Sequence, residues 1–185
     1  MVGYENVYNY LRRLNMLIAH IPAGYITTRY YNRIAGENIS FSRYGLLFSI
    51  WPDFDLLYFY LVDKKATFHH LYFTHIPLSV VIAFVFIVPI YLLDKSKKLF
   101  KIYLLFLISW FLHLILDTLT GGIAWLYPLK SSVIKLIEIP SQHSNWIVNF
   151  VFHWSFLIEI SITAWAVILL FADKRIHISY SKAIK

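Results

Sequence analysis

The sequence contains no cysteine and few charged residues. Its 185 residues include no Cys, and charged side chains make up only 15% of the chain. The absence of Cys excludes a disulfide framework, a Cys-ligated zinc site and thiol catalysis. A soluble domain is about 25% charged and about 45–50% apolar, whereas 59% of this chain is hydrophobic. The composition therefore excludes a disordered protein and predicts one membrane-embedded domain over residues 1–185.

The net charge of +7 is the feature that needs a separate explanation. Lys and Arg in the loops of a membrane protein lie against anionic lipid headgroups. The aromatic residues, 19% of the chain, are typical of the belts found at membrane surfaces. We therefore expect membrane lipid, and no nucleic acid, as the partner of the basic surface.

Three segments are apolar enough to cross a membrane. A spanning helix needs about 20 mostly apolar residues. Residues 73–93 and 146–172 reach this length, and a third segment reaches it when it runs from about residue 99 to residue 119. In the first of these segments we expect Thr74 to cap the helix and Pro77 to lie in its first turn.

The first 62 residues predict two further helices. Residues 7–31 are helix-like, and residues 41–62 are apolar but interrupted by Trp51-Pro52-Asp53-Phe54-Asp55. Proline removes a helical hydrogen-bond donor and restricts the residue before it, so we expect the second helix to end near Trp51. The sequence thus predicts an all-α polytopic membrane bundle of about five helices, with one or two of them broken at the site.

The distribution of Lys and Arg predicts an orientation for this bundle. If the loop at residues 94–101 is cytoplasmic, most of the Lys and Arg residues fall on the cytoplasmic side, as membrane proteins prefer. Residues 173–185 then form a basic cytoplasmic tail. We therefore expect an inner-membrane protein with its polar site toward the extracytoplasmic face.

Seven ionisable residues lie at the ends of the apolar segments, and the predicted topology brings them to one end of the bundle. Ionisable residues inside apolar helices are costly and usually functional. Imidazole and carboxylate groups are ligands for zinc, manganese or iron. The seven candidate ligands are His20, Asp53, Asp55, His70, His75, His113 and Asp117.

His113 and Asp117 give the sharpest local signal. Residues four apart share one helical face, so both side chains can reach one cation. Alternatively, the pair forms a hydrogen bond that joins two helices, and Asp53 and Asp55 cap a helix or face solvent. His69 is expected to be an interfacial neighbour of the site rather than a ligand.

Three more ionisable residues follow the apolar segments that carry the cluster. We expect His143 to be a solvated loop residue. His153 and Glu159 are six residues apart, which places them on different helical faces, and they suggest a separate contact between helices.

The ordered motifs resemble those of the YdjM-like family of inner-membrane, metal-dependent hydrolases. They are Trp51-Pro52-Asp53-Phe54-Asp55, His70-Leu71-Tyr72-Phe73-Thr74-His75 and His113-Leu114-Ile115-Leu116-Asp117, and His20 matches an early His of the family. The family carries Arg-Gly at the place of Leu71-Tyr72, so a guanidinium that would contact a phosphoryl oxygen is missing there. More remotely, the order of the ligands is similar to that of the zinc-dependent phospholipase C superfamily, which implies cleavage of phosphoester bonds.

The residues and the resemblance together predict a membrane-embedded hydrolase that uses metal-activated water. We expect one or two divalent ions, zinc first and manganese or iron as alternatives. Asp55 and His70 are expected to be catalytic, as a general base or as ligands of a second ion. The expected substrate is a lipid-like phosphoester.

Two other functions are compatible with the same cluster. A metal-ion or ion-coupled transporter also needs carboxylates and imidazoles within the membrane. A scaffold in which the polar groups only lock helices together would bind no metal.

Overall fold

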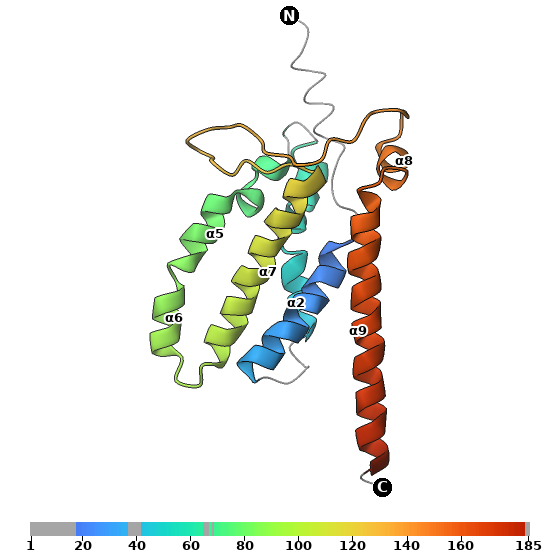
Figure 1. Cartoon of the computed structure of the whole chain (residues 1–185). Coiled ribbons are helices and arrows are strands. Elements are labelled where there is room, and N and C mark those ends of the chain that lie inside the picture. Colours follow the sequence, from blue (N-terminus) through green and yellow to red (C-terminus); the bar gives the residue numbers. More distant parts are fainter. Residues whose placement is uncertain (1–17, 37–41, 65–66, 68, 184–185) are drawn as a thin grey trace, which may run out of the picture.

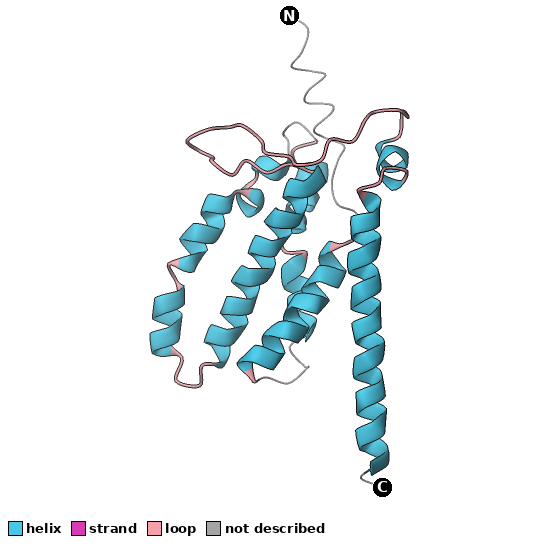
Figure 2. Ribbon diagram, viewed as in Figure 1, coloured by secondary structure: helices cyan, strands magenta, loops and turns pink. Residues whose placement is uncertain are grey.

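The computed structural model describes residues 18–36, 42–64, 67 and 69–183, and this part of the chain is helical (Figure 1). Figure 2 shows helices joined by loops, and within the described residues the only strand-like pairing is an isolated bridge between Ile123 and Ile134. The expected all-α class is confirmed. The elements are α2 (His20–Ala35), α3 (Ser42–Ser49), η2 (Pro52–Phe54), α4 (Asp55–Leu61), η3 (His69–Leu71), η4 (Phe73–His75), α5 (Pro77–Phe84), α6 (Ile87–Leu93), α7 (Lys98–Thr120), α8 (Trp146–Val151) and α9 (Phe156–Ala183).

Two helices in the described part of the chain are long and apolar enough to cross a membrane. They are Lys98–Thr120 and Phe156–Asp173, with mean hydropathies of 2.1 and 2.0, whereas the apolar segment Pro77–Leu93 is shorter. The expected bundle of about five spanning helices is therefore not confirmed. Of the predicted helix at residues 7–31, residues 7–17 lie outside the described residues, and α2 begins at His20.

Two of the expected spans are interrupted, each for a local reason. Between α5 and α6 the helix breaks at Val85 and Phe86, because the ring of Pro89 clashes with the carbonyl four residues earlier and offers it no N–H. The expected helix at residues 146–172 breaks between α8 and α9, where the His153 ring accepts a hydrogen bond from the Ser155 backbone N–H at 3.3 Å. Such side-chain bonds compete with helical ones.

Proline also sets the starts of two elements, as expected. The helix α3 ends at Ser49, and Pro52 opens η2 directly after Trp51. Pro77 is in the first turn of α5, but the capping residue is Ile76 rather than Thr74. The expected cap at Thr74 is wrong because its hydroxyl donates to Asp55 instead, at 2.5 Å.

The helices pack side by side, with α7 between α5 on one side and α2 on the other, and α9 against the far side of α2 (Figure 1). The helix α3 packs against both α2 and α7. Its approach to α2 depends on glycine, since a Cβ on Gly45 would lie 1.5 Å from Thr28 Oγ1 and one on Gly24 would lie 2.3 Å from Ser49 Oγ. Small residues that let backbones approach closely are typical of helix contacts in membranes.

The loop after α7 crosses the end of the bundle at which α2, α5 and α9 begin (Figure 1). Its backbone satisfies the last carbonyl groups of α7, which have no partner within the helix. Leu136 N donates to Thr118 O at 3.0 Å, and Ile137 N donates to Leu119 O at 2.8 Å. This fixes the loop over the end of α7 that carries His113 and Asp117.

Candidate metal centre

The carboxylate of Asp117, in the last turn of α7, is the centre of the polar cluster. Its Oδ1 lies 3.2 Å from His20 Nε2, at the start of α2. Its Oδ2 lies 3.1 Å from His113 Nε2, 3.5 Å from His75 Nε2 and 3.7 Å from His70 Nε2. Four imidazoles from four elements therefore turn the same ring nitrogen toward one carboxylate.

Asp53 completes this arrangement from η2. Its Oδ1 lies 3.6 Å from His113 Nε2 and 3.9 Å from His75 Nε2. The two Nε2 atoms are themselves 3.3 Å apart. The His20 ring stacks on the His113 ring with centroids 3.8 Å apart, so the cluster has no room for a side chain between them.

Backbone carbonyls hold two of the imidazoles in this orientation. The Nδ1 of His113 lies 2.7 Å from Ser49 O, and the Nδ1 of His70 lies 2.7 Å from Gly122 O. A carbonyl oxygen only accepts, so Nδ1 is the protonated nitrogen in both rings and the Nε2 of a neutral ring offers a lone pair to the centre. Metal-binding imidazoles in proteins are held in this way.

A carboxylate holds the third imidazole. Asp55 Oδ2 lies 2.7 Å from His75 Nδ1 and also accepts a hydrogen bond from Thr74 Oγ1 at 2.5 Å. Asp55 therefore contacts His75 on the side away from Asp117. The structure brings Asp55 into the cluster as expected, at the outer end of the His75 ring.

The cluster is closed to solvent except at one residue. The side chain of Asp53 is 30% exposed, whereas those of the other six expected ligands are at most 8% exposed. Access from outside therefore passes Asp53.

Burial and charge act differently on the two imidazoles of the η3–η4 segment. Burial lowers the pKa of His70 to about 4. Burial also disfavours the charged form of His75, but the neighbouring carboxylates of Asp117 and Asp55 outweigh it and raise the pKa of His75 to about 9. His70 is therefore neutral near pH 7 and able to bind a cation without first losing a proton.

The donor set fits a divalent cation. Three groups of residues each place ligand atoms within 4.8 Å of one another: His20, His113 and Asp117; Asp53, His75 and His113; and His69, His70 and His75. Asp117 Oδ2 is buried and makes no hydrogen bond to the described residues. A buried carboxylate oxygen without a hydrogen bond is costly, and a cation among the surrounding Nε2 atoms would offset that cost.

His69 is the residue that the sequence interpretation left out. It was expected only as an interfacial neighbour, yet it is buried and belongs to one of the three groups. Its ring centroid lies 4.2 Å from that of His70 and 5.3 Å from that of His75. The available signal is the adjacent pair His69-His70, which lies six and five residues before His75.

His143, His153 and Glu159 belong to other contacts. His143 and His153 line a separate small pocket beside α8. Glu159, on α9, is fully buried and accepts a hydrogen bond from the Ile18 backbone N–H at 2.7 Å. Glu159 thus joins α9 to the bend that precedes α2.

Comparison with known proteins gives one match. The family model described as YdjM inner membrane protein matches residues 16–180, which include the whole cluster. Searches of the curated proteins and of the solved structures found no significant match.

Proposed function

The chain belongs to the YdjM inner membrane protein family, and we propose that it is a membrane-embedded, metal-dependent hydrolase. The observation that carries this proposal is the convergence of imidazole Nε2 atoms from α2, η3, η4 and α7 on the buried carboxylate of Asp117. Joining helices would need one or two such contacts. A set of this size, with three of the four ring orientations fixed from behind, is typical of a metal centre.

One or two divalent ions would be held by the residues whose ligand atoms face the centre: His20, Asp53, His70, His75, His113 and Asp117. Imidazole and carboxylate donors without thiolate suit zinc, and also manganese or iron. When bound, such an ion supplies a lowered pKa for a bound water molecule and stabilises negative charge in the transition state.

The residues of the chain have distinct proposed roles around this ion. Asp55 is a positioning residue, because it holds Nδ1 of His75 and so keeps Nε2 of that ring toward Asp117. His70, neutral near pH 7, is able to accept a proton or to bind a second ion. Asp53 lies at the accessible side of the centre, where it meets an arriving substrate first.

The proposed reaction is hydrolysis of a phosphoester bond in a lipid-like substrate. The centre lies at the end of α7, a candidate span, and the end of a span is where a lipid would present its polar head. A negatively charged phosphoryl group would be attracted to a cation at that place.

Metal analysis of the full-length protein purified in detergent tests the proposal. We expect stoichiometric transition metal in the wild type, its loss in Asp117→Asn, and metal-dependent release of nitrophenol from bis-(p-nitrophenyl) phosphate. Asp94→Asn is the matched control, because Asp94 lies in the loop between α6 and α7, at the other end of α7 from the centre. Wild-type protein without metal would refute the proposal and favour a scaffold.

The same preparation distinguishes a transporter from a hydrolase. Stoichiometric metal without turnover, together with metal uptake by vesicles that contain the protein, would identify a carrier and contradict the hydrolase. Turnover lost in Asp117→Asn but kept in Asp94→Asn would support the hydrolase.

A further inference from the structure

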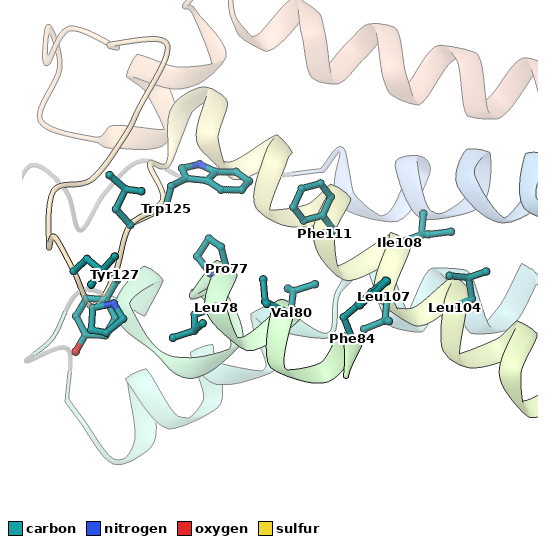
Figure 3. Close-up of a pocket in the computed structure, with 14 residues that line it drawn as sticks. Pro77, Leu78, Val80, Phe84, Leu104, Leu107, Ile108, Phe111, Trp125 and Tyr127 are labelled. Atoms are coloured by element: carbon teal, nitrogen blue, oxygen red, sulfur yellow. The ribbon is translucent and has the colours of Figure 1, made fainter. Parts of the chain in front are cut away.

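A groove of about 850 Å³ runs between α5 and α7, apart from the metal centre. Figure 3 shows its walls, formed by side chains of the two helices, with Trp125 and Tyr127 at one end. Phe111 lines the groove, and His113 is two residues later, about 200° further round the helix at 3.6 residues per turn. The groove and the centre therefore use different faces of α7. Its volume lies within the range of about 300–1,000 Å³ that is usual for small-molecule sites.

The lining of the groove is apolar from end to end. It consists of aliphatic, proline and aromatic residues, without a charged side chain. The polar side-chain groups are the Trp125 indole, whose Nε1 donates to Thr118 Oγ1 at 2.9 Å, and the Tyr127 hydroxyl. Both lie at the same end, in the loop that follows α7. The groove thus suits a molecule with a long hydrocarbon part and a polar part at one end.

The surroundings of the groove favour a lipid chain as its occupant. Its wall α7 is a candidate span of an inner-membrane protein, and Val81 and Phe84 on the α5 wall are 61% and 57% exposed, so the groove is open to the bilayer. Residues 125–129, in the loop after α7, border the polar end of the groove. A partner helix crossing the membrane would continue past that end, whereas a lipid chain stops there and gives way to its head.

The polar end of the groove adjoins the metal centre through two residues. Pro77 lines the groove and follows His75 by two positions, a distance along the chain of at most about 7 Å. Trp110, on α7, belongs to the same buried apolar cluster as Val80, which lines the groove. The Nε1 of Trp110 donates a hydrogen bond to Thr74 O at 2.6 Å. Thr74 in turn donates to Asp55. One wall of the groove is therefore bonded to the segment that positions His75.

We propose that this groove binds the hydrocarbon chain of a single membrane lipid and holds the lipid's polar head beside Pro77, next to the metal centre. That the bound lipid is the substrate rests on the proposed function. Binding of the chain itself does not, because the groove is formed by residues outside the centre.

Photolabelling of the full-length protein in vesicles tests this proposal. The vesicles contain phosphatidylethanolamine and phosphatidylglycerol with a diazirine at the end of one acyl chain, and labelled peptides are located by mass spectrometry. We expect α5 and α7 peptides that line the groove to carry more label than the exposed face of α9. Ile108→Trp, which fills the groove from α7, should reduce this label to the level on α9.

A matched variant and a second groove variant make the result interpretable. Ile160→Trp places the same side chain on α9, at a position 46% exposed against 39% for Ile108, and should leave the groove label unchanged. Val81→Trp fills the groove from the facing helix and should reduce the groove label in the same way. It serves as the test variant if Ile108→Trp does not fold. Both groove variants should retain the metal content of the wild type.

Uniform labelling of all exposed apolar faces, unaffected by Ile108→Trp and Val81→Trp, would overturn the proposal. Absence of label from the groove peptides of the wild type would overturn it as well. Failure of the proposed function would give a different result. A wild type that binds no metal, but whose groove label is blocked by both variants, would refute the proposed function and still support the lipid site.

Discussion

Removing the charge of Asp55 while keeping its shape tests whether this residue positions His75. The carboxylate lies 2.7 Å from His75 Nδ1 and accepts from Thr74 Oγ1, and neither contact places it beside Asp117. Asp55→Asn keeps the volume and an accepting oxygen but removes the charge that strengthens the bond to Nδ1. Loss of such an outer partner typically costs 10–100-fold in metal affinity, or about 1.4–2.7 kcal/mol.

The assay is competition for zinc between the purified protein and a chromophoric chelator, followed at constant pH in detergent. We expect Asp55→Asn to bind the wild-type number of ions with an affinity lower by about 10–100-fold. Thr74→Val is the control, since it removes only the neutral partner of Asp55 and should cost less. An affinity equal to that of the wild type would refute the positioning role, and a reduced number of bound ions would show that Asp55 is itself a ligand.

Three further results are expected. Gly122→Ala should lower the metal content, because φ is +88° there and a Cβ would lie 2.6 Å from Val133 Cγ1, which would displace the carbonyl that binds His70. Gly36→Ala is the control, since Gly36 has φ +66° but lies in open space. It carries a similar backbone penalty of about 1–2 kcal/mol and should keep the metal content of the wild type. Equal metal content in these two variants would contradict the role of the Gly122 carbonyl. Gly45→Ala should lower the free energy of unfolding in detergent by about 1–3 kcal/mol, because its Cβ would meet Thr28. The measurement is the melting temperature, and an unchanged value would show that α2 and α3 separate easily. Zinc affinity should fall as pH decreases below about 9, because the pKa of His75 is raised to about 9 and its proton then competes with the metal; an affinity independent of pH would exclude His75 as a ligand.

Much of the candidate site could be predicted from the sequence, because its ligands are carried by local patterns. The spacing of His113 and Asp117 on one helical face and the helix end before Pro52 are set by geometry within a few residues. These patterns placed all seven expected ligands at one end of the bundle, where the structure has them. His69 was not recognised, because whether it faces the centre or the membrane depends on how η3 packs against α4.

The breaks in the helices were harder to predict, since composition alone favours continuous spans. The interruption before Pro89 follows from the carbonyl that the ring excludes four residues earlier, an effect that the apolar composition of the segment conceals. The interruption at Ser155 depends on a bond to the His153 ring, which no periodicity reveals. The carbonyl partners of His113 and His70 were equally hidden, because every residue has a carbonyl and only the fold selects one.

Those two carbonyl partners make the cluster sensitive to segment length rather than to residue type. Ser49 O and Gly122 O belong to the main chain, so no side-chain replacement deletes them. An insertion or deletion of one residue at the end of α3, or just after α7, would bring a different carbonyl opposite each ring and turn it out of line. Ser49 is buried against Gly24, so we expect homologous chains to accept only other small residues at position 49, while they conserve the spacing that leads to it.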